Sequence, residues 1–139
     1  MHDSLSKIKN IKRKEYNLIR YSNSFNLYEK IKYNVSISLE ILLKKYHSDG
    51  KYIGIYWPLK GEVDIRFIRD MYNHKLALPS SSKINGISYH YWSEKKLETD
   101  SNNIPAPLKE KAITPTDMSI IFLPALAIDQ YGYRLGYGG

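Results

Sequence analysis

The sequence contains no cysteine, and this absence excludes several kinds of chemistry. A chain without cysteine forms no disulfide framework, offers no thiolate to a metal and has no cysteine nucleophile. Such a composition suits a reducing compartment, so we expect a cytoplasmic protein. The sequence also lacks an apolar run of about 20 residues, the length that a membrane helix needs. Its basic start has no apolar middle like that of a signal peptide. We therefore expect no membrane insertion and no export.

Acidic residues are scarce relative to basic ones. The chain has 21 Lys and Arg against 14 Asp and Glu, a formal net charge of +7. A positive field of this kind attracts phosphates and carboxylates, so anionic partners are expected. Nucleic acid is a lesser candidate, because only the basicity favours it. The histidines show neither metal-ligand spacing nor pairing with a nucleophile, and we expect structural or solvated roles for His2, His47, His74 and His90.

The hydrophobic pattern predicts two helices at the start of a single domain. With 139 residues, the chain is long enough for one packed core and too short for two ordinary domains. Apolar residues recur at helical spacing among lysines and arginines from Ser4 to Arg20, which predicts a basic amphipathic helix. After a polar break that offers an N-cap, the same period continues from Phe25 to about Tyr46. Asp49 and Gly50 end this second helix.

Short apolar segments alternate with further helical pattern in the rest of the chain. We predict a helix near Ile65–Tyr72 and a loop over Glu98–Asp117, where three prolines disfavour long regular elements. The predicted strands are Tyr52–Trp57, Lys75–Pro79, Gly86–Trp92 and Ser119–Pro124. This alternation predicts an α/β domain with a largely parallel sheet, whose ligands bind beyond the carboxyl ends of the strands.

The last segment, DQYGYRLGYGG, is rich in glycine. It follows the apolar stretch IIFLPALAI and carries Arg134 among four glycines in eight residues. Glycine lets backbone N–H groups approach a phosphate closely, although glycines after a strand also form ordinary turns. The segment is neither a Walker loop nor a dinucleotide fingerprint. By itself it is a phosphate-loop candidate.

The stretch PALAIDQYGYRLGYGG resembles the signature of the 5-formyltetrahydrofolate cyclo-ligase family, also called 5,10-methenyltetrahydrofolate synthetase, usually written PGLAFD..G.RLG.G.GYYD. The matching residues are Pro124, Leu126, Ala127, Asp129, Gly132, Arg134, Leu135, Gly136 and Gly138. The resemblance implies that this loop binds ATP phosphates and that Arg134 is catalytic. The residues it implies for ATP binding here are Arg134, Leu135, Gly136, Tyr137, Gly138 and Gly139.

A second block, YIGIYWPLKGEVDIRFI, resembles the strand and turn of the same family that receive the folate. The resemblance implies substrate binding by Glu62, and by Trp57, whose aromatic ring suits a flat pterin. The structural alternative is that Trp57 only ends a buried strand and that Glu62 caps the next helix.

The N-terminal helix carries a third block, because KNIKRKEYNLIRYSNS resembles the opening K...R......R pattern of the family. Lys9 and Arg13 lie four residues apart, so one helical face presents both cations. The resemblance implies that this pair reaches ATP phosphates. Lys7, Lys12 and Lys14 are rival candidates for the lysine, and a solvated basic face is the structural alternative.

The chain departs from the family pattern in two places. In NNIPAPLKE, Asn103 and Ala106 replace the glycine and the glutamate of G-I-P-E-P, so no function is assigned there. The family loop continues into a further Gly, two Tyr and an Asp, of which the Asp is the implied magnesium ligand. No metal ligand is named in this chain. We expect residues 1–139 to form a single cyclo-ligase-like domain, an N-terminal portion that lacks the end of the ATP loop and the closing elements.

Taken together, the resemblance implies a three-layer α/β fold with helices flanking a mostly parallel sheet, incomplete at the C-terminus. It implies ATP-dependent conversion of 5-formyltetrahydrofolate to 5,10-methenyltetrahydrofolate, with Mg²⁺ assisting and with release of ADP and phosphate. We expect little or no turnover from these 139 residues. Two alternatives stay open: a non-catalytic remnant that binds nucleotide or folate, and a basic nucleic-acid-binding module in which Tyr89, Tyr91 and Trp92 stack on bases.

Overall fold

The computed structural model describes residues 2–71 and 75–137, and the chain divides into two compact units. The first unit combines residues 1–30 with residues 124–139, and the second comprises Ile31–Leu123. Each unit is described by itself below. The single domain expected from the chain length stays a prediction.

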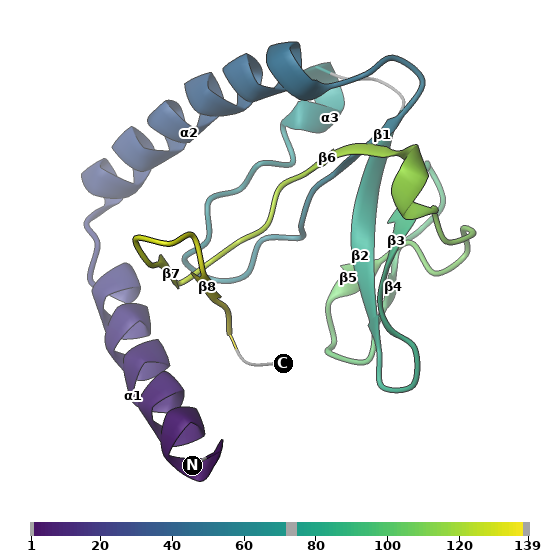
Figure 1. Ribbon diagram of the computed structural model, residues 1–139. Helices are drawn as coiled ribbons and strands as arrows, with labels where there is room; N and C mark the ends of the chain where they lie inside the picture. Colours follow the sequence, from purple (N-terminus) through teal and green to yellow (C-terminus); the bar gives the residue numbers. More distant parts are fainter. Residues whose placement is uncertain (1, 72–74, 138–139) are drawn as a thin grey trace. The chain divides into compact units, whose positions relative to one another are not determined.

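Both helices predicted near the N-terminus are confirmed (Figure 1). Helix α1 spans His2–Tyr21 and helix α2 spans Phe25–Tyr46. Ser24 caps α2, because its hydroxyl oxygen accepts a hydrogen bond from the Leu27 N–H at 3.3 Å. Gly50 follows the helix with a left-handed φ of 82°, which suits the turn into the first strand. Among the described residues, no helix is long and apolar enough to cross a membrane.

The main sheet confirms the α/β class. Its strands, in the spatial order β3-β2-β1-β6, are β1 (Tyr52–Gly54), β2 (Leu76–Ser82), β3 (Gly86–Tyr91) and β6 (Met118–Ile121). Strand β1 pairs in parallel with both β2 and β6, whereas β2 and β3 form an antiparallel hairpin, visible in Figure 1. The sheet is therefore mixed and mostly parallel.

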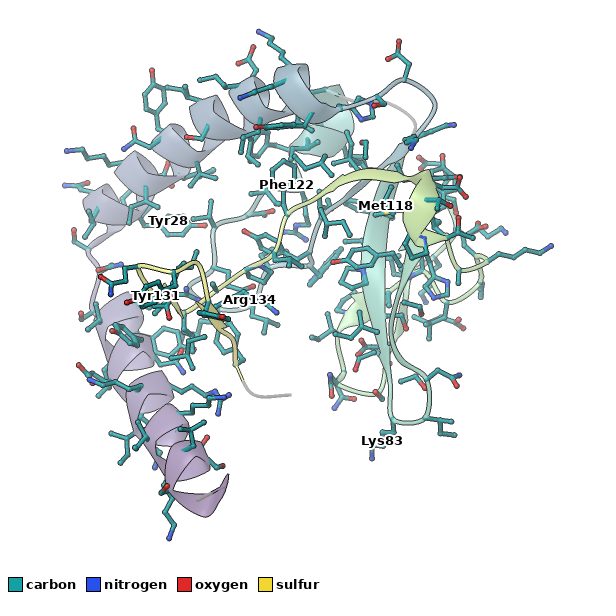
Figure 2. The ribbon with its side chains drawn as sticks, in the orientation of Figure 1. Tyr28, Lys83, Met118, Phe122, Tyr131 and Arg134 are labelled. Atoms are coloured by element: carbon teal, nitrogen blue, oxygen red, sulfur yellow. The ribbon has the colours of Figure 1, made fainter. Side chains whose placement is uncertain are left out.

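Close approach at the centre of this sheet explains one glycine. A Cβ on Gly54 would lie 2.8 Å from Met118 Cε and 3.1 Å from both Ile121 Cγ1 and Tyr89 Cε1. Met118, labelled in Figure 2, begins the neighbouring strand β6. A side chain at position 54 would force these neighbours apart.

Several element boundaries differ from the sequence expectation. Strand β6 begins one residue earlier than predicted and ends at Ile121 and not at Pro124, and β3 ends one residue early, at Tyr91. Strand β1 is shorter than predicted, although the Ile55 N–H still donates to the Ala77 carbonyl at 2.9 Å. Strand β2 continues past Pro79. The last β2 residue paired with β1 is Ala77, so the missing N–H of Pro79 removes no hydrogen bond between β2 and β1. Helix α3 spans only Ile68–Met71, since the residues before it form i→i+3 turns, and Tyr72 lies outside the described residues.

The predicted loop over Glu98–Asp117 holds only short elements, as its prolines indicated. They are β4 (Glu98–Thr99), β5 (Pro105–Ala106) and a 3-10 turn, η1 (Pro115–Asp117). The glycine-rich segment, expected to be a loop, contains a small antiparallel hairpin instead. Its strands are β7 (Ala127–Ile128) and β8 (Arg134–Leu135).

The hydrophobic core belongs to the second unit. Leu39 and Leu43 of α2 pack with buried isoleucines and leucines of the sheet and of the segment that follows β1: Ile53, Ile55, Ile65, Ile68, Leu76 and Leu78. Burial of each such side chain contributes roughly 1.5–3 kcal/mol. Trp57 and Trp92 are partly buried against this core, so the core supports the segment in which substrate binding is predicted.

Candidate functional site

The segment after β1 forms a tight turn closed by its own hydrogen bonds. Pro58 interrupts the strand pattern, and the Glu62 N–H donates to the Leu59 carbonyl at 3.0 Å. Gly61 supplies the left-handed φ of 80° that this turn requires. The Tyr56 hydroxyl donates to the Val63 carbonyl at 2.7 Å, which ties the strand end to the far side of the turn.

Glu62 is only 6% exposed, and its carboxylate folds back over this turn. Oε2 accepts the Leu59 N–H at 2.8 Å. The Glu62 carboxylate does not cap the next helix, which was the structural alternative, because α3 begins six residues after Glu62, at Ile68. Glu62 closes the turn that carries it.

Trp57 lies in an aromatic and cationic cluster. Its ring meets the Trp92 ring edge to face, with centroids 6.1 Å apart and an interplanar angle of 70°. The Arg66 guanidinium carbon lies 4.4 Å from the Trp57 ring centroid, within cation–π range. Trp57 therefore packs in a cluster beyond the end of β1, and substrate binding by this residue stays a prediction. The sequence did not indicate Arg66, because its contact with Trp57 comes from the fold of the segment.

Asp64 holds Arg66 in place by a bidentate ion pair. Asp64 Oδ1 accepts from Arg66 Nε at 2.9 Å, and Oδ2 accepts from Nη2 at 2.7 Å. The Arg66 guanidinium lowers the pKa of Asp64 below its ordinary value, and Lys32 contributes to the same effect. The pKa of Arg66 is raised in turn by its hydrogen bond to Asp64. Both groups are therefore charged at neutral pH.

In the first unit, the glycine-rich segment is organised by Asp129. Its Oδ1 accepts the N–H groups of Tyr131 and Tyr133 at 2.9 and 2.8 Å, and Gly132 adopts a φ of 85° in the turn between β7 and β8. Figure 2 labels Tyr131 and Arg134 on this hairpin. Arg134 is exposed, and its Nη1 donates to the Pro124 carbonyl at 2.8 Å.

The first unit also brings the cationic face of α1 to this segment. Arg13 Nε donates to the Gly136 carbonyl at 3.0 Å. Arg20 bonds to the Tyr137 hydroxyl and donates to the Ala125 carbonyl at 2.5 Å. The sequence reasoning left Arg20 out, although it is the last residue of the K...R......R pattern.

The contacts on α1 bear on which lysine accompanies Arg13 in the predicted phosphate site. Lys9 is exposed, whereas its rival Lys12 forms an ion pair with Glu15 at 2.8 Å. This pairing favours Lys9 over Lys12 as the cation available to an anion. The structure therefore brings Arg13 to the loop and leaves Lys9 on the surface of the same helix.

Gly136 has open space around it among the residues that the structure describes. Apart from its two chain neighbours, none of their atoms lies within 4 Å of a Cβ placed at this position. Packing therefore does not explain the glycine, while close approach of a phosphate to the backbone would. Leu135 and Tyr137, beside it, are half-buried, and Gly138 and Gly139 lie outside the described residues.

The two departures from the family pattern have structural reasons. Asn103 adopts a left-handed φ of 59°, a conformation that glycine takes freely and that asparagine tolerates better than most residues. Ala106 is fully buried in β5, where a carboxylate would have to lose its water.

A functional site in the described residues could also take the form of a cluster of metal ligands or of a cavity. Residues 2–71 and 75–137 contain no group of three or more His, Asp or Glu side chains that could hold a metal ion, so no magnesium ligand is assigned. A cavity of about 430 Å³ in the second unit involves the Tyr52 and Tyr91 rings and Lys109, and none of the predicted site residues lines it.

The fold is similar to that of known folate enzymes. The chain superposes on the NMR structure of the 5,10-methenyltetrahydrofolate synthetase of Aquifex aeolicus with a TM-score of 0.74 and 30% sequence identity, over 95% of this chain and 68% of that one. A 5,10-methenyltetrahydrofolate synthetase from Mycoplasma pneumoniae shares the fold at 19% identity, with a TM-score of 0.71 over 94% of this chain and 71% of that one. Comparisons with protein-family models and with curated proteins found no match.

The α/β fold thus has the architecture of a folate cyclo-ligase. With 30% identity over two thirds of the Aquifex enzyme, the chain belongs to the 5,10-methenyltetrahydrofolate synthetase family. This confirms the resemblance seen in the sequence.

Proposed function

We propose that the chain binds ATP and 5-formyltetrahydrofolate and supports the ATP-dependent formation of 5,10-methenyltetrahydrofolate, in the cytoplasm. In this reaction the formyl oxygen attacks the γ-phosphorus of ATP, and ADP leaves with the electron pair of the broken P–O bond. N10 then attacks the formyl carbon, loses its proton, and the C–O bond breaks to release phosphate. Catalysis of such a step depends on positioned cations more than on a protein nucleophile.

The observation that carries the nucleotide half of the proposal is the grouping of cations around an open glycine. Arg13 contacts the Gly136 carbonyl directly, and Arg134 lies two residues before it. The space at Gly136 would admit a phosphate oxygen to the backbone. We assign Arg134, Leu135, Gly136 and Tyr137 to the triphosphate, with Lys9 and Arg13 for its outer oxygens, and we extend the assignment to Gly138 and Gly139. Mg²⁺, when bound with ATP, would neutralise phosphate charge.

The folate half of the proposal is supported by the turn after β1. Trp57 offers part of its ring beside the hydrophobic core, and a flat pterin can pack on such a surface. Glu62 holds the turn and supplies a carboxylate at its base. We assign both residues to 5-formyltetrahydrofolate.

The test measures binding and turnover separately on the 139-residue chain. Calorimetry with ATP and with 5-formyltetrahydrofolate should each give saturable binding. Arg134→Ala should weaken ATP by about 10-fold or more, roughly 1.4 kcal/mol, and Trp57→Ala should weaken the folate alone. Lys83→Ala, which removes a labelled surface cation on the β2–β3 turn (Figure 2), is the matched control and should change neither.

Formation of the methenyl product, followed by its absorbance with Mg-ATP, then decides between an enzyme and a remnant. Binding of both ligands without product would identify a non-catalytic binding protein. Absence of saturable binding for either ligand would overturn the proposal, and RNA binding that ATP does not displace would favour the nucleic-acid module.

A further inference from the structure

Trp57, Trp92 and two arginines form one cluster in the second unit, with an arginine over each ring. The Arg69 guanidinium carbon lies 4.2 Å from the Trp92 ring centroid, much as Arg66 lies over Trp57. Arg69 is also bonded to the Ser93 carbonyl at 3.0 Å and to Glu94 at 2.7 Å. Each arginine therefore lies over a tryptophan ring and has an acidic partner. They differ in the ring they cover: Arg66 lies over Trp57, a predicted substrate residue, and Arg69 lies over Trp92.

Arg66 is held with one edge of its guanidinium turned toward Asp64. The Nε and Nη2 groups on that edge donate to the carboxylate, and the arginine side chain stays 34% exposed. A guanidinium has a second fork, formed by Nη1 and Nη2, that can bind a planar or tetrahedral anion bidentately. No residue in the described part of the second unit accepts a hydrogen bond from Nη1. This outer fork is fixed in position and open to a ligand.

Distance decides which anion of a bound folate the fork can reach. The Arg66 guanidinium lies over one face of the Trp57 ring, 4.4 Å from its centroid, so we take as its partner an anion attached directly to a ring that packs on the rest of that tryptophan. The glutamate carboxylate of a folate is separated from the pterin by the whole aminobenzoyl group. The formyl oxygen, in contrast, is bonded through one carbon to N5 of the pterin, and it becomes anionic when it is phosphorylated.

We propose that Arg66 is a catalytic residue of the proposed reaction, which binds the phosphoryl group on the formyl oxygen through Nη1 and Nη2. The inference rests on the proposed function, and it adds a residue that the family pattern in this segment did not indicate. Asp64 is its positioning residue, because it fixes the guanidinium over Trp57. Lys32 also lowers the pKa of Asp64, so a second cation acts on this ion pair.

The experiment compares Arg66→Ala, Arg66→Lys and the matched control Arg69→Ala, whose arginine makes an equivalent ring contact to Trp92. Circular dichroism first establishes that each variant is folded. Calorimetry then measures the affinity for 5-formyltetrahydrofolate alone, and for inorganic phosphate when the folate is saturating. Turnover with Mg-ATP gives kcat and KM for the wild-type chain and for each variant.

We expect Arg66→Ala to leave folate affinity within about 3-fold and to weaken folate-dependent phosphate binding by 10-fold or more. Where turnover is measurable, kcat should fall by about 100-fold, the effect of removing one preorganised donor from a developing anion, with KM for the folate little changed. Arg66→Lys should recover part of both losses, and Arg69→Ala should match the wild type.

Unchanged phosphate affinity in Arg66→Ala would overturn the inference while leaving the proposed function intact. A loss of folate affinity that disappears with 5-formyltetrahydropteroate, which lacks the glutamate, would assign Arg66 to the glutamate carboxylate instead and would also overturn it. If wild-type chain binds no folate at all, the proposed function fails and the inference falls with it.

Discussion

At the scale of single residues, a substitution at Gly136 should affect ligand binding and leave stability almost unchanged. Its Cα faces open space, so Gly136→Ala should change the free energy of unfolding by no more than about 0.5 kcal/mol, as for most surface substitutions. The same methyl group would occupy the place of a phosphate oxygen, and ATP affinity should fall by about 10-fold or more. Urea unfolding and ATP calorimetry on the same preparation measure the two effects. Unaltered ATP binding would remove this glycine from the nucleotide site.

Asp64 predicts a pH dependence of stability. Its pKa in the folded chain is lowered from 3.8 by Arg66. Its contribution to stability is therefore fully present above the unfolded-state pKa and is lost as the pH falls through the lower folded value. The ion pair is more than one third exposed on the Asp64 side, so salt should weaken the effect.

We expect wild-type chain to be more stable than Asp64→Asn at pH 7, with the difference shrinking below about pH 3.8. Urea midpoints measured from pH 7 down to pH 2, at low and high salt, test this. A difference between the two chains that does not change with pH would contradict the assignment.

The sequence can nominate site residues that lie in family patterns, but it does not indicate contacts that depend on folding. Trp57, Glu62 and Arg134 lie in contiguous motifs, and they stay predicted site residues. Arg66 becomes part of the cluster only because the chain turns at Gly61 and returns over Trp57, a contact that no spacing rule supplies.

At the scale of elements, the β7–β8 hairpin depends on one carboxylate. Asp129→Ala removes the acceptor of the Tyr131 and Tyr133 N–H groups. The loss should destabilise the hairpin by about 1 kcal/mol, the usual net value of an intramolecular hydrogen bond. Asp129→Asn keeps an acceptor oxygen and should be milder.

Limited proteolysis between residues 125 and 137 measures this effect. Cleavage there should accelerate in Asp129→Ala and much less in Asp129→Asn. Equal cleavage of wild type and Asp129→Ala would show that the two strands hold the hairpin without the carboxylate.

Element prediction succeeded where a period was long enough to recognise. The helices α1 and α2 carry 20 and 22 residues of regular pattern, and both matched the expected ranges closely. The strands β7 and β8 have two residues each, too few for an alternation to appear. Helix α3 was predicted too long because i→i+3 turns and an α-helix share the same apolar spacing over one turn.

At the scale of the whole molecule, the two units differ in how much they bury. All the residues of the hydrophobic core lie in the second unit, and none of the described residues of the first unit is buried. Segments with few buried contacts open more easily. Amide hydrogens of α1 should therefore exchange faster than those of β1 and β2.

Ligands should shift these exchange rates selectively. Bound ATP stabilises the folded form of whatever unit holds it, so saturating ATP should slow exchange in α1 and in residues 125–137 more than in the main sheet. Exchange followed by mass spectrometry, with Arg134→Ala as the control that should not respond, checks this. Slowing confined to residues 52–82 would place the nucleotide in the second unit.

The sequence predicted the α/β class of the fold, but it did not predict the division of the chain into two compact units. Alternation of helices and apolar strands was enough to predict an α/β sheet, and the family signature added its identity. The first unit joins two distant parts of the chain, residues 1–30 and residues 124–139, and composition does not reveal such a pairing.

The turn between Tyr56 and Arg66 is fixed by its own bonds, from the Tyr56 hydroxyl to the Val63 carbonyl and from the Leu59 N–H to Glu62. A ligand that meets it therefore finds the backbone already ordered. Binding to such a surface loses little conformational entropy. Association at this turn should proceed in a single kinetic phase, at a rate set by encounter and not by rearrangement of the turn.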